Sequence, residues 1–229
     1  MTLENVTLEV GSGYGILNSG ELLIKTGTYN GGTGIITNSG NCTIDGGTYT
    51  VTAQYAAGIE NSGTLVINNG EINNSNNVTI NNSSTGTLNI TDGNFENRGN
   101  GTIGYTNYNI MNITGGTFTE KGGGSWSYGY ISNCIFNDTN ATLTIDGATF
   151  NNTDNGGRFL LNYGNATIDN SSISMKYILE EYTGTVTFNS DGSKEDNYKF
   201  TNKAGDVREG TVSYDVDGKH IAFVYSSGI

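Results

Sequence analysis

The sequence is poor in several features that would narrow its function directly. It contains no proline and a single histidine, and only 14% of its 229 residues are charged. No run of apolar residues approaches the roughly 20 that a membrane-spanning helix needs, so we expect no membrane insertion. The chain carries 10 lysines and arginines against 22 aspartates and glutamates, which gives a formal net charge of −12. That charge repels phosphate backbones and anionic membranes, so we do not expect nucleic acid as a partner.

Cysteine is scarce as well, since Cys42 and Cys134 are the only two. Cys42 occupies a position that is leucine in other copies of the repeat described below, so we interpret it as a small core residue. Cys134 lies several repeats later, and stacked repeats rise by about 4.8 Å each. That separation is beyond the reach of a disulfide bond. We therefore predict free thiols, and the cysteines do not indicate a redox compartment.

A repeated phrase organises the rest of the chain. Residues 61–72 read NSGTLVINNGEI, and the similar phrases NSGNCTIDGGTY and NSGELLIKTGTY occupy residues 38–49 and 18–29. Within each phrase apolar residues alternate with polar ones, which is strand spacing, and a glycine then breaks the strand. Glycine, asparagine and threonine are unfavourable in helix interiors. The 35 glycines and the abundant asparagine and threonine therefore argue against long helices.

Three columns of apolar residues continue this phrase at intervals of about 20 to 23 residues, the range of solenoid repeats. The first column comprises Leu22, Cys42, Leu65, Leu88, Met111, Leu143, Ala166 and Val186. The second column, two residues later, comprises Ile24, Ile44, Ile67, Ile90, Ile113, Ile145, Ile168 and Phe188. The third column, five residues after the second, comprises Tyr29, Tyr49, Ile72, Phe95, Phe118, Phe150 and Ile173.

Stacked coils explain these columns. One coil cannot bury its own apolar side, whereas in a stack each column becomes a ladder of like side chains inside a tube. The intervals suit coils of three short strands, and we assign the third strand from a column of Ile35, Ile59, Ile80, Ile103, Ile131, Leu160 and Ile178. The turn after the third strand begins with Asn18, Asn38, Asn61 or Asn162. Asparagine tolerates left-handed backbone, and its amide can bond the coils above and below, so we predict a structural asparagine ladder.

The columns divide the chain into two regions. We predict an all-β, right-handed parallel β-helix of about eight coils over residues 1–190, and a β-rich capping segment with a β-hairpin over residues 191–229. The one large irregularity is the interval of about 32 residues between Ile113 and Ile145, in which residues 121–130 should loop out of the coil. In the cap, Asp217-Gly218 between two apolar stretches is a hairpin signal. Because repeat-like sequence begins at once after Met1, we expect the chain to be cut from a longer protein.

Two short phrases carry a resemblance to known proteins. They are Gly46-Gly47-Thr48-Tyr49 and Gly115-Gly116-Thr117-Phe118. With the columns, they resemble the right-handed parallel β-helix (pectate-lyase-like) superfamily and are similar to repeat regions of large bacterial surface adhesins. The resemblance covers about residues 1–190. It implies an extracellular stalk or a ligand-binding solenoid, in some cases one that binds carbohydrate, although a fold does not define an activity.

The insertion carries the candidate ligand site. Trp126, the only tryptophan, alternates with Tyr128 and Tyr130 along it, outside the inward columns. Exposed aromatic rings offer flat apolar faces to sugar rings and to protein partners. Functional residues also concentrate on loops that a rigid scaffold holds. The competing interpretation is that this loop packs onto the coil beneath it, and the sequence does not decide between the two.

Acidic residues provide weaker candidates, and we predict no catalytic residue, no resident metal and no cofactor. Exposed turn positions are the simplest explanation of three aspartates that follow the first strand of their coils, Asp45, Asp146 and Asp169. A calcium site is the alternative for three residues with calcium-loop composition but without the spacing of a known loop, Asp191, Glu195 and Asp196.

These observations favour a non-enzymatic function outside the cell. We expect a monomeric segment of a secreted or cell-surface bacterial adhesin that binds a glycan or a host surface protein, or that acts as a stalk. A polysaccharide-active β-helix enzyme, a lyase or hydrolase, or a relic of one, is the first alternative. It would need acidic residues that converge in a groove. An ice-binding β-solenoid is the second alternative, and it would need a flat, regular threonine face.

Overall fold

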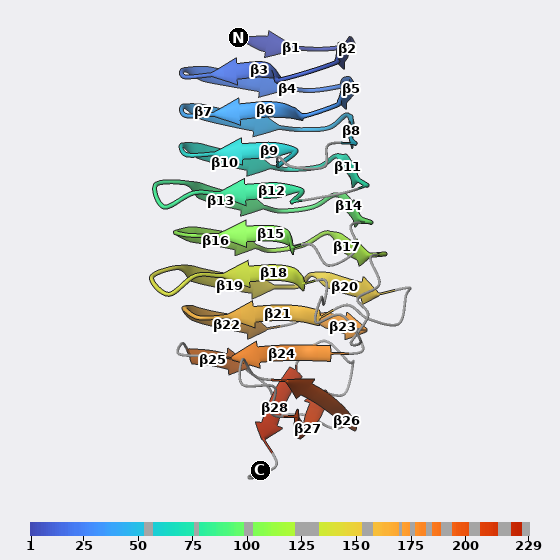
Figure 1. Ribbon diagram of the computed structural model, residues 1–229, viewed down its shortest axis with the longest axis vertical. Coiled ribbons are helices and arrows are strands. Elements are labelled where there is room, and N and C mark those ends of the chain that lie inside the picture. The colour runs from blue at the N-terminus through green and yellow to red at the C-terminus, as the bar shows by residue number, and fades with distance from the viewer. Residues whose placement is uncertain are drawn as a thin grey trace.

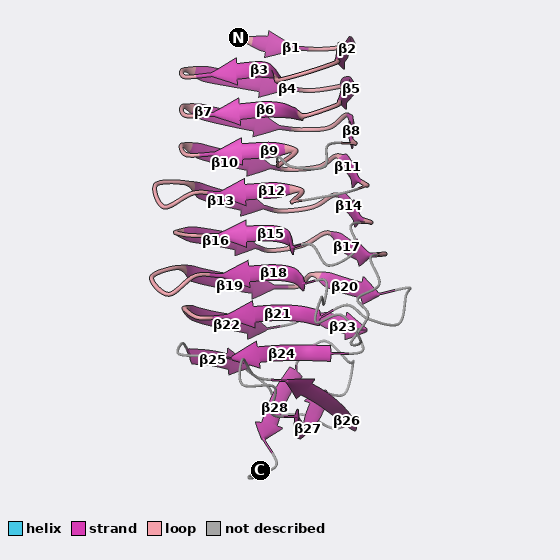
Figure 2. Cartoon of the chain, viewed as in Figure 1, coloured by secondary structure: helices cyan, strands magenta, loops and turns pink. Residues whose placement is uncertain are grey.

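The computed structural model is a column of stacked coils (Figure 1). It describes residues 1–52, 57–75, 78–98, 103–121, 133–152, 158–169, 171–174, 177–181, 185–188, 194–201, 207–214 and 221–225. Figure 2 shows strands and connecting loops, and the described residues contain no helix. Three parallel sheets, here called A, B and C, form the walls of the tube. The fold is an all-β parallel β-solenoid, which confirms the class that the columns predicted.

Successive coils add one strand to each sheet, so that sheet A contains nine strands and sheets B and C contain eight each. The strands of sheet A are β1 (Thr2–Leu3), β4 (Glu21–Ile24), β7 (Asn41–Ile44), β10 (Thr64–Ile67), β13 (Thr87–Ile90), β16 (Ile110–Ile113), β19 (Thr142–Asp146), β22 (Asn165–Asp169) and β25 (Thr185–Phe188). Those of sheet B are β2 (Val6–Val10), β5 (Gly27–Gly31), β8 (Thr48–Val51), β11 (Glu71–Asn74), β14 (Asn94–Asn97), β17 (Thr117–Glu120), β20 (Thr149–Asn152) and β23 (Ser172–Ser174). Those of sheet C are β3 (Tyr14–Asn18), β6 (Gly34–Asn38), β9 (Ile59–Asn61), β12 (Ile80–Asn82), β15 (Ile103–Asn107), β18 (Asn133–Asn137), β21 (Arg158–Asn162) and β24 (Tyr177–Glu181).

Beyond the last coil, a separate antiparallel sheet contains β26 (Lys194–Thr201), β27 (Val207–Tyr214) and β28 (Ile221–Tyr225). Strands β27 and β28 are antiparallel neighbours, with Tyr214 opposite Ile221. In Figure 1 this sheet lies at the C-terminal end of the column. A sealing role for this sheet remains a prediction, based on the need to cover open strand edges.

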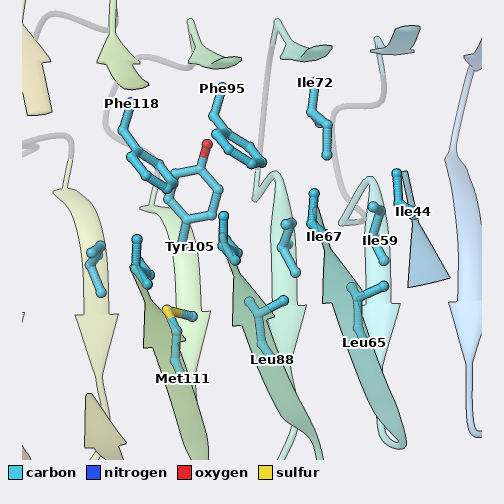
Figure 3. Packing of buried hydrophobic residues seen from close by; sticks show 14 of the residues in the cluster. Ile44, Ile59, Leu65, Ile67, Ile72, Leu88, Phe95, Tyr105, Met111 and Phe118 are labelled. Atoms are coloured by element: carbon cyan, nitrogen blue, oxygen red, sulfur yellow. The ribbon is translucent and has the colours of Figure 1, made fainter. Parts of the chain in front are cut away.

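The three predicted columns of sheets A and B hold their register from coil to coil. In sheet A, Leu65 has Cys42 and Leu88 as its Cα partners. In sheet B, Ile72 has Phe95 as one of its partners. All five side chains are buried, with 1% exposure or less. Alternate positions of each strand therefore point into the tube (Figure 3), and their burial stabilises the stack.

Stacked aromatic rings fill part of the interior beside sheet B. The ring centroid of Phe118 lies 4.6 Å from that of Phe95 and 4.8 Å from that of Phe150. Tyr105 of sheet C meets Phe95 and Phe118 edge-on, at 6.2 and 5.4 Å (Figure 3). The ring spacing is close to the strand spacing of about 4.8 Å. One ring per coil therefore follows directly from the strand register.

The column predicted for sheet C was correct at Ile59, Ile80 and Leu160 and wrong at three other described positions. At Ile35, Ile103 and Ile178 the register places Ile36, Tyr105 and Leu179 instead, whereas Ile131 lies outside the described residues. The prediction failed because each of these strands offers a second apolar residue one or two positions away, so the apolar pattern alone does not choose between them. Ile35, for example, is as fully buried as Ile36.

Glycine is required at the bend between sheets A and B. Five glycines at this bend lie two residues before the apolar residues of the third column. Their φ angles are between 94° and 147°, a region that residues with a side chain rarely adopt. They are Gly27, Gly47, Gly70, Gly93 and Gly116.

The predicted asparagine ladder runs along the end of sheet C. Nδ2 of Asn61 donates to Oδ1 of Asn82 at 2.8 Å and to the carbonyls of Gly63 and Thr87 at 3.1 Å. The backbone part of the prediction was wrong, because Asn5 is the one described non-glycine residue with a positive φ. The ladder therefore uses the asparagine amide, and its described members are Asn18, Asn38, Asn61, Asn82, Asn107, Asn137 and Asn162.

Candidate functional site

The insertion predicted to bind a ligand lies between β17 and β18. Its aromatic residues, Trp126, Tyr128 and Tyr130, lie outside the residues that the structure describes. Lys121, which follows β17 directly, is described, and its ammonium group forms an ion pair with Glu96 of β14. The start of the insertion is thereby tied to the outer face of sheet B.

A polar cleft of about 300 Å³ lies on this face, at the edge where the strands of sheet B end. Strands β8, β11 and β14 line it from three consecutive coils. Thr50, Asn73 and Glu96 are successive Cα partners on the outer side of these strands. Among the described residues, the lining comprises Thr50, Val51, Glu71, Asn73, Asn74, Ser75, Glu96 and Arg98.

Hydrogen bonds hold the cleft lining in place. Nδ2 of Asn73 donates to Oε1 of Glu71 at 2.9 Å. The hydroxyl of Ser75 donates to the carbonyl of Val51 on the preceding coil at 3.1 Å. The backbone N–H of Arg98 donates to the carbonyl of Asn74 at 2.8 Å. Because the coil-to-coil pairing that builds the solenoid also builds the cleft, the cleft is formed before any ligand arrives.

Glu96 is the electrostatic centre of the cleft. Its carboxylate pairs with the guanidinium of Arg98 and with the ammonium of Lys121. Burial acts to raise the pKa of Glu96, but the hydrogen bonds and positive charges of Lys121 and Arg98 together outweigh it and hold that pKa below its ordinary value. Glu96 is therefore ionised at neutral pH and accepts hydrogen bonds without serving as a proton donor.

The cleft offers both donors and acceptors to a ligand. The hydroxyls of Thr50 and Ser75 and the amide of Asn73 can each donate and accept, carboxylates accept, and the guanidinium of Arg98 donates. A ligand rich in hydroxyl groups matches this lining, because each hydroxyl also donates and accepts. The sequence contained a signal for this cleft: Thr50, Asn73 and Glu96 each directly follow a residue of the third apolar column.

Two of the aspartates expected after the first strand, Asp45 and Asp146, are exposed. Asp146 and Asp169 are Cα partners on adjacent coils, as predicted. Asp45 is exposed and accepts a hydrogen bond from Nδ2 of Asn68 at 2.8 Å. Neither Asp45 nor Asp146 lines the cleft on sheet B.

The calcium alternative concerned residues near the C-terminus. Asp191 lies outside the described residues, while Glu195 and Asp196 belong to β26 and are opposite Ser213 and Val212. Within the described part of the chain, no group of three or more histidine, cysteine, aspartate or glutamate residues is placed to hold a metal ion.

The outer face of sheet A does not form a regular threonine array. Glu21 and Lys25 at β4 are exposed there, and Leu23 between them is partly exposed. On β16, Ile110 is 39% exposed at the start of the strand. These side chains interrupt the flat threonine face that ice binding would need.

A second surface feature was not predicted from the sequence. The rings of Tyr108, Phe136 and Tyr163 lie on three successive coils where sheet C leads into sheet A, with centroids 5.7 and 5.6 Å apart. Leu161 is the Cα partner of Phe136, and both side chains are partly exposed. We call these four residues the corner stripe. Each ring is adjacent in the chain to an asparagine of the ladder, which is the sequence signal that could have revealed it.

No helix in the described ranges is long and apolar enough to cross a membrane. Comparison of the chain with protein-family models, with curated proteins and with solved structures gives no match.

Proposed function

We propose that this chain is a non-enzymatic, glycan-binding segment of a secreted or cell-surface bacterial adhesin, and that the cleft on sheet B binds the glycan. The observation that carries this proposal is the lining of the cleft. Three consecutive coils place hydroxyl, amide, carboxylate and guanidinium groups around one volume of about 300 Å³. That volume is at the lower end of the range for small-molecule sites, and it suits one or two sugar units of a longer chain.

The position of the cleft supports a shared site with the insertion. Lys121 is bound to Glu96, and the residues that follow it include Trp126. An aromatic ring can stack on the apolar face of a sugar while polar groups bond its hydroxyls. We therefore assign Trp126, Tyr128 and Tyr130 the stacking role and Asn73, with its neighbours in the cleft, the hydrogen-bonding role.

The adhesin assignment rests on the coil phrases, which are similar to repeat regions of bacterial surface adhesins. An extended solenoid suits such a protein because each coil pairs only with its neighbours, so a ligand site can be held at a distance from an attachment point. A host surface protein is the other partner that such a segment could bind, and a stalk without a ligand is the simplest competing function.

A polysaccharide-active enzyme is the second candidate, because two carboxylates, Glu71 and Glu96, line the same cleft together with Arg98. Glycoside hydrolysis uses paired carboxylates of which one must carry a proton. Glu96 does not fit that role, since its two cationic partners keep it ionised. Incubation with acidic and neutral polysaccharides would support the enzyme if chains were shortened by the wild type and not by Glu71→Gln.

A glycan array followed by titration tests the binding proposal. The purified chain should bind a defined set of glycans, and Asn73→Ala should weaken binding to the best of them by about tenfold or more, as expected for a residue at the centre of a site. Trp126→Ala should have a similar effect. Asn89→Ala is the matched control, because Asn89 is an outward asparagine on sheet A that accepts a comparable bond from Asn112 at 2.9 Å.

The variants separate the competing functions. Equal affinity of wild type and Asn73→Ala, with unchanged melting curves, would move the glycan off the cleft. Loss of binding in Trp126→Ala alone would place the site on the insertion. A chain that binds no glycan on the array would leave the stalk as the better assignment.

A further inference from the structure

The corner stripe presents aromatic and aliphatic surface on the outside of the solenoid. Tyr108 is 38% exposed, and Phe136, Leu161 and Tyr163 are partly exposed. The ring centroids are 5.7 Å apart for Tyr108 and Phe136 and 5.6 Å for Phe136 and Tyr163. The rings are tilted by 58° and 59° to one another. Partly exposed apolar side chains gathered on consecutive coils are typical of an interaction surface.

Carboxylates border this stripe. Asp138 follows Phe136 by two residues, and its backbone N–H donates to the carbonyl of Asn107 at 2.9 Å, which places it in the turn beside Tyr108. Burial and the negative charges of Asp138 and Glu60 raise the pKa of the Tyr108 hydroxyl. The negative charges of both carboxylates are therefore felt at Tyr108, the ring at the N-terminal end of the stripe.

Glu60 is fixed in position by neighbouring side chains. Its Oε2 accepts a hydrogen bond from Nδ2 of Asn81 at 2.6 Å, and its Oε1 accepts one from the hydroxyl of Tyr14 at 3.3 Å. Thr106 in turn donates to Oδ1 of Asn81, and Thr106 is the Cα partner of Phe136. A polar column on the outer face of sheet C therefore leads from Glu60 directly to the corner stripe.

No cation neutralises these carboxylates in the part of the chain that the structure describes. The ion pairs seen there are those of Lys25 with Glu4 and of Arg98 and Lys121 with Glu96. The whole chain has a net charge of −12. A second copy of so acidic a chain would be repelled from an acidic surface, whereas a basic partner would be attracted to it.

We propose that the corner stripe, with Asp138 and Glu60, docks a lysine- or arginine-bearing segment of a partner protein. A cation over the face of an aromatic ring is attracted to it within about 6 Å of the centroid. Tyr108 supplies that ring, and Asp138 supplies the opposite charge. Phe136 and Leu161 contact the aliphatic stem that long basic side chains carry. This site does not depend on the cleft, which lies on another sheet.

Titration with a synthetic lysine-rich peptide tests this proposal on the full chain. The peptide should bind, and the same peptide with acetylated lysines should bind at least about tenfold more weakly, because acetylation removes the charge. Tyr108→Leu should weaken binding about two- to fivefold, the size expected for one cation–π contact at an exposed site. Tyr108→Phe keeps the ring and should bind like the wild type.

A matched pair of charge variants separates local contact from general attraction. Asp138→Asn and Asp45→Asn change the net charge equally, and Asp45 is exposed on sheet A, away from the stripe. Asp138→Asn should weaken peptide binding by about threefold or more, and Asp45→Asn should have little effect. Equal effects of the two variants, or equal binding of the acetylated peptide, would overturn the proposal. So would a Tyr108→Leu variant that folds normally and binds the peptide like the wild type.

Discussion

At the scale of single residues, one step along a strand separates a core side chain from a surface side chain. Ile67 is fully buried, with Ile44 and Ile90 as its Cα partners on the coils before and after it. Val66 is its neighbour in the chain, but it faces outward and is partly exposed. The same substitution at these two positions therefore tests the orientation of the whole sheet.

Ile67→Asn should lower the free energy of unfolding by about 3 to 5 kcal/mol, because it removes buried apolar surface and places an unpaired amide inside the tube. Val66→Asn should cost less than about 1 kcal/mol, as surface substitutions usually do. Its outward column already contains Thr43 and Asn89 as Cα partners. Urea denaturation of both variants measures the difference, and equal losses would contradict the inward and outward assignment.

At the scale of elements, the asparagine ladder joins the ends of sheet C strands to the start of sheet A strands. Nδ2 of Asn82 donates to Oδ1 of Asn107 at 2.9 Å, to the carbonyl of Ile110 at 2.8 Å and to the carbonyl of Gly86 at 3.2 Å. Asn82 is fully buried. One amide thus satisfies acceptors on two coils at a corner where strand pairing stops.

Asn82→Ala should destabilise the protein by about 3 kcal/mol, because it leaves buried oxygens at this corner without a donor. Asn112→Ala is the control, since Asn112 makes a single amide–amide bond to Asn89 on the outer face of sheet A. The control should cost less than about 1 kcal/mol. Thermal and urea unfolding give both values. If the two variants were equally stable, the ladder would contribute no more than an ordinary surface hydrogen bond.

At the scale of the whole molecule, the two proposed binding surfaces lie on different walls of the solenoid. The cleft is on sheet B, and the corner stripe lies where sheet C leads into sheet A. Each sheet pairs its strands only along the stack. Substitutions at distant, independent sites usually act additively, so glycan binding and peptide binding should respond to separate sets of variants.

The spacing of the coils also keeps the two cysteines apart. Both are free and buried. Cys42 lies in β7 and Cys134 in β18, three coils further along. At about 4.8 Å per coil the two are roughly 14 Å apart, about twice the largest Cα separation that a disulfide spans. Alkylation of the denatured, unreduced protein should therefore add two groups by intact mass. A mass without alkylation would contradict the coil assignment.

The native protein should react slowly in the same experiment. Burial raises the pKa of the Cys42 thiol to about 12, and burial with the nearby charge of Glu120 raises that of Cys134 well above its usual range. The thiolate is the reactive form, and a raised pKa makes it rarer at pH 8. Fast modification of both thiols in the folded chain at that pH would contradict their burial.

The inward positions of sheets A and B could be predicted from the sequence, whereas those of sheet C could be predicted only in part. The columns of sheets A and B followed from the sequence, because each inward residue recurs at a nearly constant interval and alternates with polar residues. The column of sheet C failed at Ile35 and Ile103, where apolar residues lie close together. Counting back two residues from each ladder asparagine would have found Ile36 and Tyr105, because strand alternation relates the two positions.

The sequence by itself determined that the chain forms stacked three-stranded coils and where the inward ladders of sheets A and B run. Only the tertiary structure decided that Thr50, Asn73 and Glu96 line one cleft and that Tyr108, Phe136 and Tyr163 lie side by side. The physical reason is that burial selects apolar residues at inward positions, which makes the inward ladders recognisable in the sequence, whereas outward positions are free of that constraint and carry side chains that differ from coil to coil.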